Sequence, residues 1–216
     1  MYFRLLKQIS RKCGKTMADK NKEKAIIDAA RKRFGHYGFS KVTMEEIAQD
    51  VELGKASLYY YFPTKEEIFK AVIYREQNEL KENIEQLLQR PVTASNKLRE
   101  YVILRMQFFR DLINLGTLSV HSYMDNKSVF KNLFVDFEKV ELTLINKIID
   151  EGIRKKEFVN LFEDDISVVF LHILQGLRCR ILRSVRGRDL DKKTRDSLQK
   201  EMKTATEIFI NGITCK

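Results

Sequence analysis

The chain has 216 residues, of which 44% are hydrophobic and 32% are charged. This composition is typical of a folded protein with a real core, and it argues against a disordered chain. No stretch of about 18 apolar residues is present, so no membrane span is expected. The first residues lack the apolar core and cleavage site of a signal peptide, and we expect a cytoplasmic protein.

The net charge of +10 is concentrated near the N-terminus. Residues 1–41 contain 12 Lys and Arg against 3 Asp and Glu, whereas the rest of the chain is almost neutral. Two interpretations remain open for this basic end: a solvated tail, or an arm held near the phosphates of nucleic acid. Met17 is an alternative start of the chain, and in that case residues 1–16 are not part of the native protein.

Neither a metal site nor an enzyme is expected. The cysteines and histidines are few, and no two of them have metal-ligand spacing: Cys13, Cys179, Cys215, His36, His121 and His172. The chain contains no Gly-rich phosphate loop, no G-x-S-x-G and no H-E-x-x-H motif. We therefore predict a non-enzymatic protein without a cofactor or a metal ion.

The N-terminal third is predicted to contain four helices. Apolar residues at helical spacing indicate a first helix over about 20–37, which ends before Gly38. Thr43 is a good N-cap for a short second helix that ends near Val51. A third short helix over about 55–62 ends at Pro63, and a fourth runs from about 65 to 89.

The remainder of the chain is also predicted to be helical. Further helices are expected over about 94–114, 117–125, 128–156, 164–185 and 191–213. Sustained alternation and hairpin turns are absent, so no strands are expected. The fold class is therefore all-α, with about nine helices.

Residues 43–65, TMEEIAQDVELGKASLYYYFPTK, are the most informative segment. Two short helices around a tight turn form a helix-turn-helix, whose second helix fits the major groove of DNA. Leu58 and Phe62 lie four residues apart and are expected to face inward. The side chains left to point outward are Lys55, Ala56, Ser57, Tyr59 and Tyr60. Their hydroxyl groups and the lysine amine can form hydrogen bonds with phosphates and base edges, and a tyrosine ring can contact a thymine methyl group.

This segment resembles the TetR family of bacterial repressors, whose pattern here reads approximately A-G-V-S-K-G-T-L-Y-H-Y-F, followed shortly by K-E. The corresponding residues are VELGKASLYYYF and KEEIF, and the specific resemblance covers about residues 21–81. It implies an N-terminal three-helix DNA-binding domain and a C-terminal helical domain for ligand binding and dimerisation. The resemblance implies DNA contacts by Thr43, Lys55, Ala56, Ser57, Tyr59, Tyr60, Tyr61 and Lys65.

Two positions depart from the family pattern. Glu52 stands where glycine is frequent, and a positive φ there costs glutamate about 1 kcal/mol. Gly54 stands where a serine usually caps the recognition helix, so one cap or phosphate contact is missing. The motif itself is not cationic, so the positive field has to come from the first helix and the arm.

The predicted organisation is a basic arm over 1–20, a DNA-binding domain over 21–81 with its motif at about 44–63, and an effector-binding and dimerisation domain over 82–216. The predicted function is a repressor released from its operator by a small molecule. Two alternatives remain open: a helical DNA-binding or interaction protein without sequence specificity, and an activator of the same family.

One recognition helix reads only a few base pairs, so we expect a homodimer on a palindromic double-stranded operator. The resemblance places the interface on the last two helices. The expected interface residues are Phe170, Leu174, Leu177, Ile181, Met202, Ala205 and Phe209. An intramolecular core is the alternative for these side chains.

An apolar or aromatic effector is expected among the helices over 94–156. Its candidate contacts are Met106, Phe109, Leu112, His121, Tyr123, Met124, Phe134 and Phe137, each of which could instead be plain core. Arginines crowd the end of the penultimate helix, at positions 178, 180, 183, 186 and 188. They are typical of cations at a helix C-terminus with a solvated loop beyond, and a second anion contact is the alternative.

Overall fold

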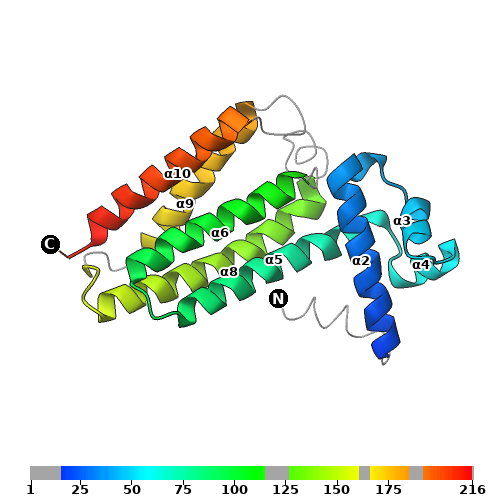
Figure 1. Ribbon diagram of the computed structural model, residues 1–216, viewed down its shortest axis with the longest axis horizontal. Coiled ribbons are helices and arrows are strands. Elements are labelled where there is room, and N and C mark those ends of the chain that lie inside the picture. The colour runs from blue at the N-terminus through cyan, green and yellow to red at the C-terminus, as the bar shows by residue number, and fades with distance from the viewer. Residues whose placement is uncertain (1–15, 115–126, 161–165, 185–191, 216) are drawn as a thin grey trace.

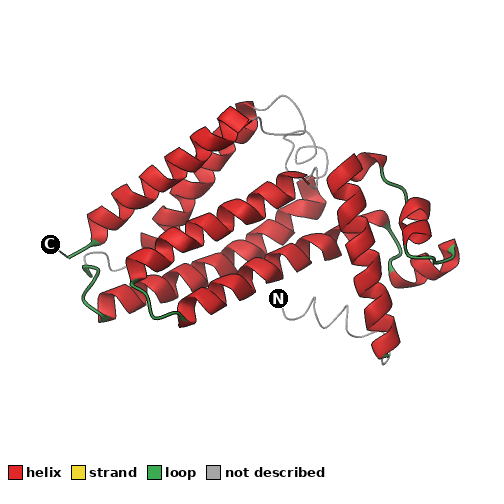
Figure 2. Cartoon of the chain, viewed as in Figure 1, coloured by secondary structure: helices red, strands yellow, loops and turns green. Residues whose placement is uncertain are grey.

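The computed structural model describes residues 16–114, 127–160, 166–184 and 192–215 (Figure 1). Within these residues the chain is built from α-helices and one 3-10 turn, without a strand (Figure 2). The elements are α2 (Met17–Tyr37), η1 (Phe39–Lys41), α3 (Met44–Asp50), α4 (Lys55–Tyr61), α5 (Lys65–Gln89), α6 (Ala94–Asn114), α8 (Lys127–Arg154), α9 (Ile166–Ser184) and α10 (Lys192–Ile213). The predicted all-α fold is confirmed. The helix expected over 117–125 lies outside the described residues.

Local chain chemistry explains where the helices begin. Thr43 and Glu46 form a capping box at the start of α3, so the predicted N-cap is confirmed. α2 begins at Met17 rather than at about residue 20, because Thr16 and Asp19 form a second capping box. The other helix ends lie within a few residues of those expected from the sequence pattern.

Helices α5, α6, α8, α9 and α10 lie along one another and form the body of the molecule (Figure 1). At one end of this body α2, α3 and α4 form a smaller unit. The long helix α5 belongs to both parts, since it packs against α2 and also against α6 and α8. A displacement of α5 would therefore act on both parts.

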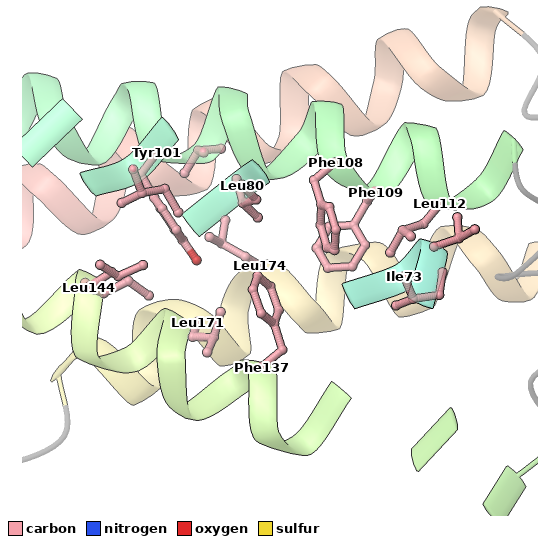
Figure 3. Packing of buried hydrophobic residues seen from close by; sticks show 14 of the residues in the cluster. Ile73, Leu80, Tyr101, Phe108, Phe109, Leu112, Phe137, Leu144, Leu171 and Leu174 are labelled. Carbon is pink, nitrogen blue, oxygen red and sulfur yellow. The ribbon is translucent and has the colours of Figure 1, made fainter. Parts of the chain in front are cut away.

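The core of the body consists of aromatic and aliphatic side chains from facing helices. In Figure 3, Phe108 and Phe109 of α6 point toward Phe137 of α8 and Leu174 of α9. The ring centroids of Phe108 and Phe137 are 5.4 Å apart. The same buried cluster continues into the small unit, where Phe34 of α2 belongs to it. The two parts therefore share one continuous core.

Candidate DNA-binding interface and ligand cavity

Residues 43–65 fold as two short helices around a tight turn. The backbone N–H of Leu53 donates to the carbonyl of Ala48 at 2.9 Å and closes the turn after α3. Ile47, Ala48 and Leu58 are buried in one cluster, so apolar packing holds α3 against α4. The geometry is that of a helix-turn-helix, and a single unbroken helix is excluded.

One side of α4 faces solvent. Lys55, Ala56 and Ser57 are exposed at its start, and farther along Tyr59 is 39% and Tyr60 is 77% exposed. These are the five side chains expected to point outward from the sequence. Their contact with DNA stays a prediction, and their display is what a recognition helix requires.

Lys55 is exposed but has a partner. Its ammonium forms an ion pair with the carboxylate of Glu45 on α3, and it lies 5.9 Å from the ring centroid of Tyr59. The hydrogen bond with Glu45 raises the pKa of Lys55. The predicted contact of Lys55 with DNA would require its ammonium to leave Glu45.

Tyr61 occupies a different environment from its two neighbours. It is half-buried, and its hydroxyl donates to the carboxylate of Asp19 in the first turn of α2 at 3.0 Å. Burial, and then this hydrogen bond, raise the pKa of Tyr61. This hydrogen bond joins α4 to α2, and the phosphate contact that the resemblance implies for Tyr61 stays a prediction.

Lys65 also has partners within the chain. Its ammonium donates to the carbonyl oxygens of Phe39 at 3.0 Å and Val42 at 2.8 Å. The same ammonium lies 4.6 Å from the ring centroid of Phe39. These contacts hold the loop before α3 onto the start of α5, and the predicted phosphate contact of Lys65 stays a prediction.

Thr43 and Gly54 begin the two helices of the motif. The Thr43 hydroxyl accepts from the backbone N–H of Glu46 at 3.3 Å, which satisfies one free donor of α3. Its expected phosphate contact stays a prediction. Gly54 is the N-cap of α4 and has no side-chain cap, as the sequence indicated.

Basic side chains lie next to the motif on α2. The bond between Asp19 and Tyr61 places the beginning of α2 beside the end of α4. The exposed residues Lys20, Lys22 and Lys24 follow directly in the first turns of α2. They supply positive charge that the motif itself lacks.

A cavity of about 460 Å³ opens among α6, α9 and α10. Its lining is Val102, Ile103, Arg105, Met106, Gln107, Phe109, Arg110, Leu174, Arg178, Lys192, Arg195, Asp196, Leu198, Gln199 and Met202. This volume is in the usual range for small-molecule sites.

The cavity includes only some of the residues expected around an effector. Met106 and Phe109 line it. Leu112 and Phe137 are buried core residues away from the lining, and Phe134 is partly buried against that core. The predicted contacts at positions 121, 123 and 124 lie outside the described residues. The cavity lies farther toward α9 and α10 than expected, because Phe108 of α6 and Phe137 of α8 pack against each other between these two helices (Figure 3).

Sequence reasoning missed a buried polar group behind the cavity. One carboxylate oxygen of Glu141 accepts from the Arg105 Nε at 2.7 Å and from the Tyr101 hydroxyl at 2.7 Å. All three side chains are almost completely buried, and burial raises the pKa of Tyr101 well above its usual value. A possible signal in the sequence was the four-residue spacing that puts Tyr101 and Arg105 on one face of an apolar helix.

Part of the predicted dimer interface is internal. Phe170, Leu174, Met202 and Phe209 are buried in the core of the single chain, which corrects their assignment. The ring centroids of Phe170 and Phe209 are 4.4 Å apart, so these residues hold α9 against α10.

Other apolar residues on α9 and α10 face outward instead. Leu177 and Ala205 are half-buried, and the side chain at position 181 is outside the described residues. The exposed fraction is 50% for Val169, 38% for Ile173 and 68% for Ile208. An interface between copies, if it uses these helices, has to use this outer face.

The described part of the chain offers neither a metal site nor a membrane span. No group of three or more His, Cys, Asp or Glu there is arranged to hold a metal ion. No helix among the same residues is both long and apolar enough to cross a bilayer.

Known proteins share this arrangement. Residues 26–72 match the family model of bacterial regulatory proteins, tetR family. A crystal structure of a transcriptional regulator from Cytophaga hutchinsonii is 39% identical to this chain, with a TM-score of 0.82, and the match covers 88% of this chain and 97% of that one.

Two relatives from other bacteria are regulators with the same type of motif. YhgD of Bacillus subtilis, an uncharacterized HTH-type transcriptional regulator, is 24% identical over 144 residues, which are 62% of this chain and 70% of YhgD. The HTH-type transcriptional regulator RutR of Escherichia coli is 42% identical over 52 residues, which are 24% of each protein. The chain thus spans only about a quarter of RutR. The family model, the 39% identical regulator and the helix-turn-helix geometry together show that this chain belongs to the TetR family of DNA-binding transcriptional regulators.

Proposed function

We propose that this regulator is a dimeric repressor that leaves its operator when a small molecule enters the cavity among α6, α9 and α10. The observation that carries the proposal is the exposed face of α4. Its polar and aromatic side chains face solvent instead of packing in the core. The proposed contacts to DNA are made by Thr43, Lys55, Ala56, Ser57, Tyr59 and Tyr60. Residues 1–20 serve as a basic arm, 21–81 as the DNA-binding part, and 82–216 as the sensor and dimerisation part.

The dimer follows from the size of the reading surface. The seven residues of α4 span about 10 Å, and a helix of this length reads only a few base pairs. Regulators of this family bind DNA and dimerise. In our proposal the outer face of α9 and α10, with Val169, Ile173 and Ile208, joins two copies on a palindromic site. That symmetry places two α4 helices in successive major grooves.

The long helix α5 is proposed to couple ligand and DNA. It packs against α2 beside the motif and against α6, which lines the cavity. A ligand that binds better to the body when the two α4 helices are misaligned shifts the population away from DNA. A coupling of about 1–3 kcal/mol is enough for regulation.

The DNA-binding surface is tested with Tyr60→Ala. We expect this variant to bind DNA from upstream of its own gene about 5- to 30-fold more weakly, since one groove contact is worth about 1–2 kcal/mol. Fluorescence anisotropy with labelled duplexes measures the affinity, and circular dichroism checks the fold. Tyr37→Ala is the matched control, because Tyr37 is an exposed tyrosine on α2 outside the motif.

Two results would contradict this proposal. Unchanged affinity in Tyr60→Ala would remove α4 from the reading surface. Equal affinity for the upstream DNA and for a scrambled duplex of the same composition would favour a protein without sequence specificity. In vitro transcription from the same promoter separates repression from activation, since only a repressor lowers the yield of transcript.

A further inference from the structure

The cavity has an unbalanced charge in its wall. Arg105 and Arg178 both line it, one from α6 and the other from α9. Their guanidinium carbons lie 4.5 Å and 3.9 Å from the ring centroid of the same residue, Phe109. Two cations thus share one aromatic ring at the inner side of the cavity.

Arg105 is already neutralised. Its Nε donates to Glu141 at 2.7 Å, and both side chains are only 3% exposed. The Tyr101 hydroxyl donates to the same carboxylate oxygen. Glu141 is therefore committed to Arg105 and Tyr101, and the hydrogen bonds around this carboxylate do not extend to Arg178.

No carboxylate among the described residues forms a hydrogen bond with Arg178. Its Nε atom is buried and makes no hydrogen bond to any of the described residues. Burial, and then the neighbouring charge of Arg105, lower the pKa of Arg178 to about 10. Cations at a helix C-terminus are usually solvated, and Arg178 departs from that pattern because it turns toward the cavity.

A buried cation without a counter-ion is costly, and an anion that arrives beside it recovers much of that cost. A guanidinium is also suited to bind a carboxylate or a phosphate through parallel hydrogen bonds. The rest of the inner lining is apolar, with Met106, Leu174 and Met202. The site therefore combines an apolar chamber with one positive charge that has no carboxylate partner in the described part of the chain.

The outer lining of the cavity is also positively charged. Arg110, Lys192 and Arg195 lie at exposed positions of the cavity, against the single acidic residue Asp196. Such a field raises the local concentration of anions and repels amines. We infer that the effector of this regulator is an organic anion, whose carboxylate or phosphate binds Arg178 and whose apolar body fills the cavity. The inference rests on the proposed role of this cavity as the effector site.

The charge preference is tested by ligand binding in the absence of DNA. The probes are decanoate, 4-phenylbutanoate and 2-naphthoate, each compared with its primary amide and the corresponding primary amine; 2-naphthyl phosphate distinguishes a phosphate from a carboxylate head group. Calorimetry and thermal shift measure binding to the full chain. We expect at least one acid to bind about tenfold more tightly than its amide, and the amines not to bind.

Variants connect this preference to one side chain. Arg178→Gln is expected to abolish the difference between acid and amide, and Arg178→Lys to retain part of it. Arg154→Gln is the matched control, because it removes the same charge from the exposed end of α8. Equal binding of acid and amide for all three apolar bodies, or a preference that persists in Arg178→Gln, would overturn the inference.

Ligand-free stability gives a second readout. Arg178→Gln is expected to raise the melting temperature, since it removes a charge whose Nε atom is buried without a partner among the described residues. Arg105→Gln is expected to lower it, because the buried carboxylate of Glu141 then keeps Tyr101 but loses its cation. A lower melting temperature in Arg178→Gln would show an ordinary structural arginine and would contradict the inference.

An assay of release from operator DNA distinguishes a failure of this inference from a failure of the proposed function. If the acids bind through Arg178 and the operator complex is unaffected, the anion site stands and the proposed effector response fails. If only uncharged or cationic compounds release the operator, the effector response stands and the anion inference fails.

Discussion

At the scale of single residues, the turn of the helix-turn-helix contains a strained position. Glu52 has a φ of 53°, which is the left-handed region that glycine tolerates best. The sequence indicated this strain, because family members often have glycine there. Glu52 is exposed and makes no packing contribution that offsets the strain.

Glu52→Gly is therefore expected to raise the free energy of unfolding by about 0.5–1 kcal/mol. Urea denaturation followed by circular dichroism measures the change. Lys156→Gly is a matched variant outside the motif, because Lys156 has a φ of 59° in the turn after α8. A loss of stability in Glu52→Gly would mean that the flexibility gained by the unfolded chain outweighs the strain relieved.

At the scale of elements, α3 is a short helix held at both ends by carboxylates. Glu46 accepts hydrogen bonds from the backbone N–H and the hydroxyl of Thr43 at 2.7 Å and 2.9 Å, and these bonds lower the pKa of Glu46. At the other end Asp50 accepts two hydrogen bonds from Arg33 of α2, and this contact lowers the pKa of Asp50. The contacts at both ends of α3 are therefore strongest when the two carboxylates are ionised.

The pH dependence of stability follows from these directions. Both carboxylates have pKa values below their ordinary values of 4.5 and 3.8. Their contribution is therefore complete above those values and is lost as the pH falls through the lower, folded-state pKa values. We expect the melting temperature to fall between about pH 5 and pH 3, and Asp50→Asn to show a smaller fall.

Asp150→Asn is the control for this experiment, because Asp150 is exposed on α8 and forms no ion pair with other described residues. It should leave the pH profile close to that of the unmodified chain. An equal fall in Asp50→Asn and in the unmodified chain would show that the bond between α2 and α3 does not contribute to acid sensitivity.

At the scale of the whole molecule, α9 and α10 expose apolar side chains that the proposed dimer can bury. Val169, Ile173 and Ile208 are large apolar side chains with at least a third of their surface in solvent. Each contributes about 1–2 kcal/mol if it becomes buried against a second copy. Symmetry doubles every such contact in a two-fold dimer.

Val169→Asp is expected to weaken the dimer by at least about 100-fold. The substitution removes buried apolar surface and places a charge in the interface, and the two-fold symmetry repeats both effects in the second copy. Analytical ultracentrifugation measures the dissociation constant, and the affinity for full-length operator DNA should fall in parallel. Val135→Asp is the control, since Val135 is 46% exposed on α8. A fully dimeric Val169→Asp protein would place the interface elsewhere.

The positions of the helices and the location of the reading motif could be deduced from the sequence. Caps such as Thr43, stops such as Pro91 and the spacing of apolar residues are local signals, and they act wherever the segment lies in the fold. The display of Tyr60 also followed from local geometry, because adjacent residues on a short helix cannot all face inward.

Only the tertiary structure decided what each amphipathic face and each long side chain contacts. The apolar stripe of α9 was visible in the sequence, but Phe170 and Leu174 turned out to pack inside the chain, and Val169 and Ile173 face outward. In the same way Lys65 bonds to carbonyls of η1 and the loop after it, and Arg178 turns toward the cavity. A helical period defines a face and its composition, whereas the partner of that face comes from segments distant in the chain.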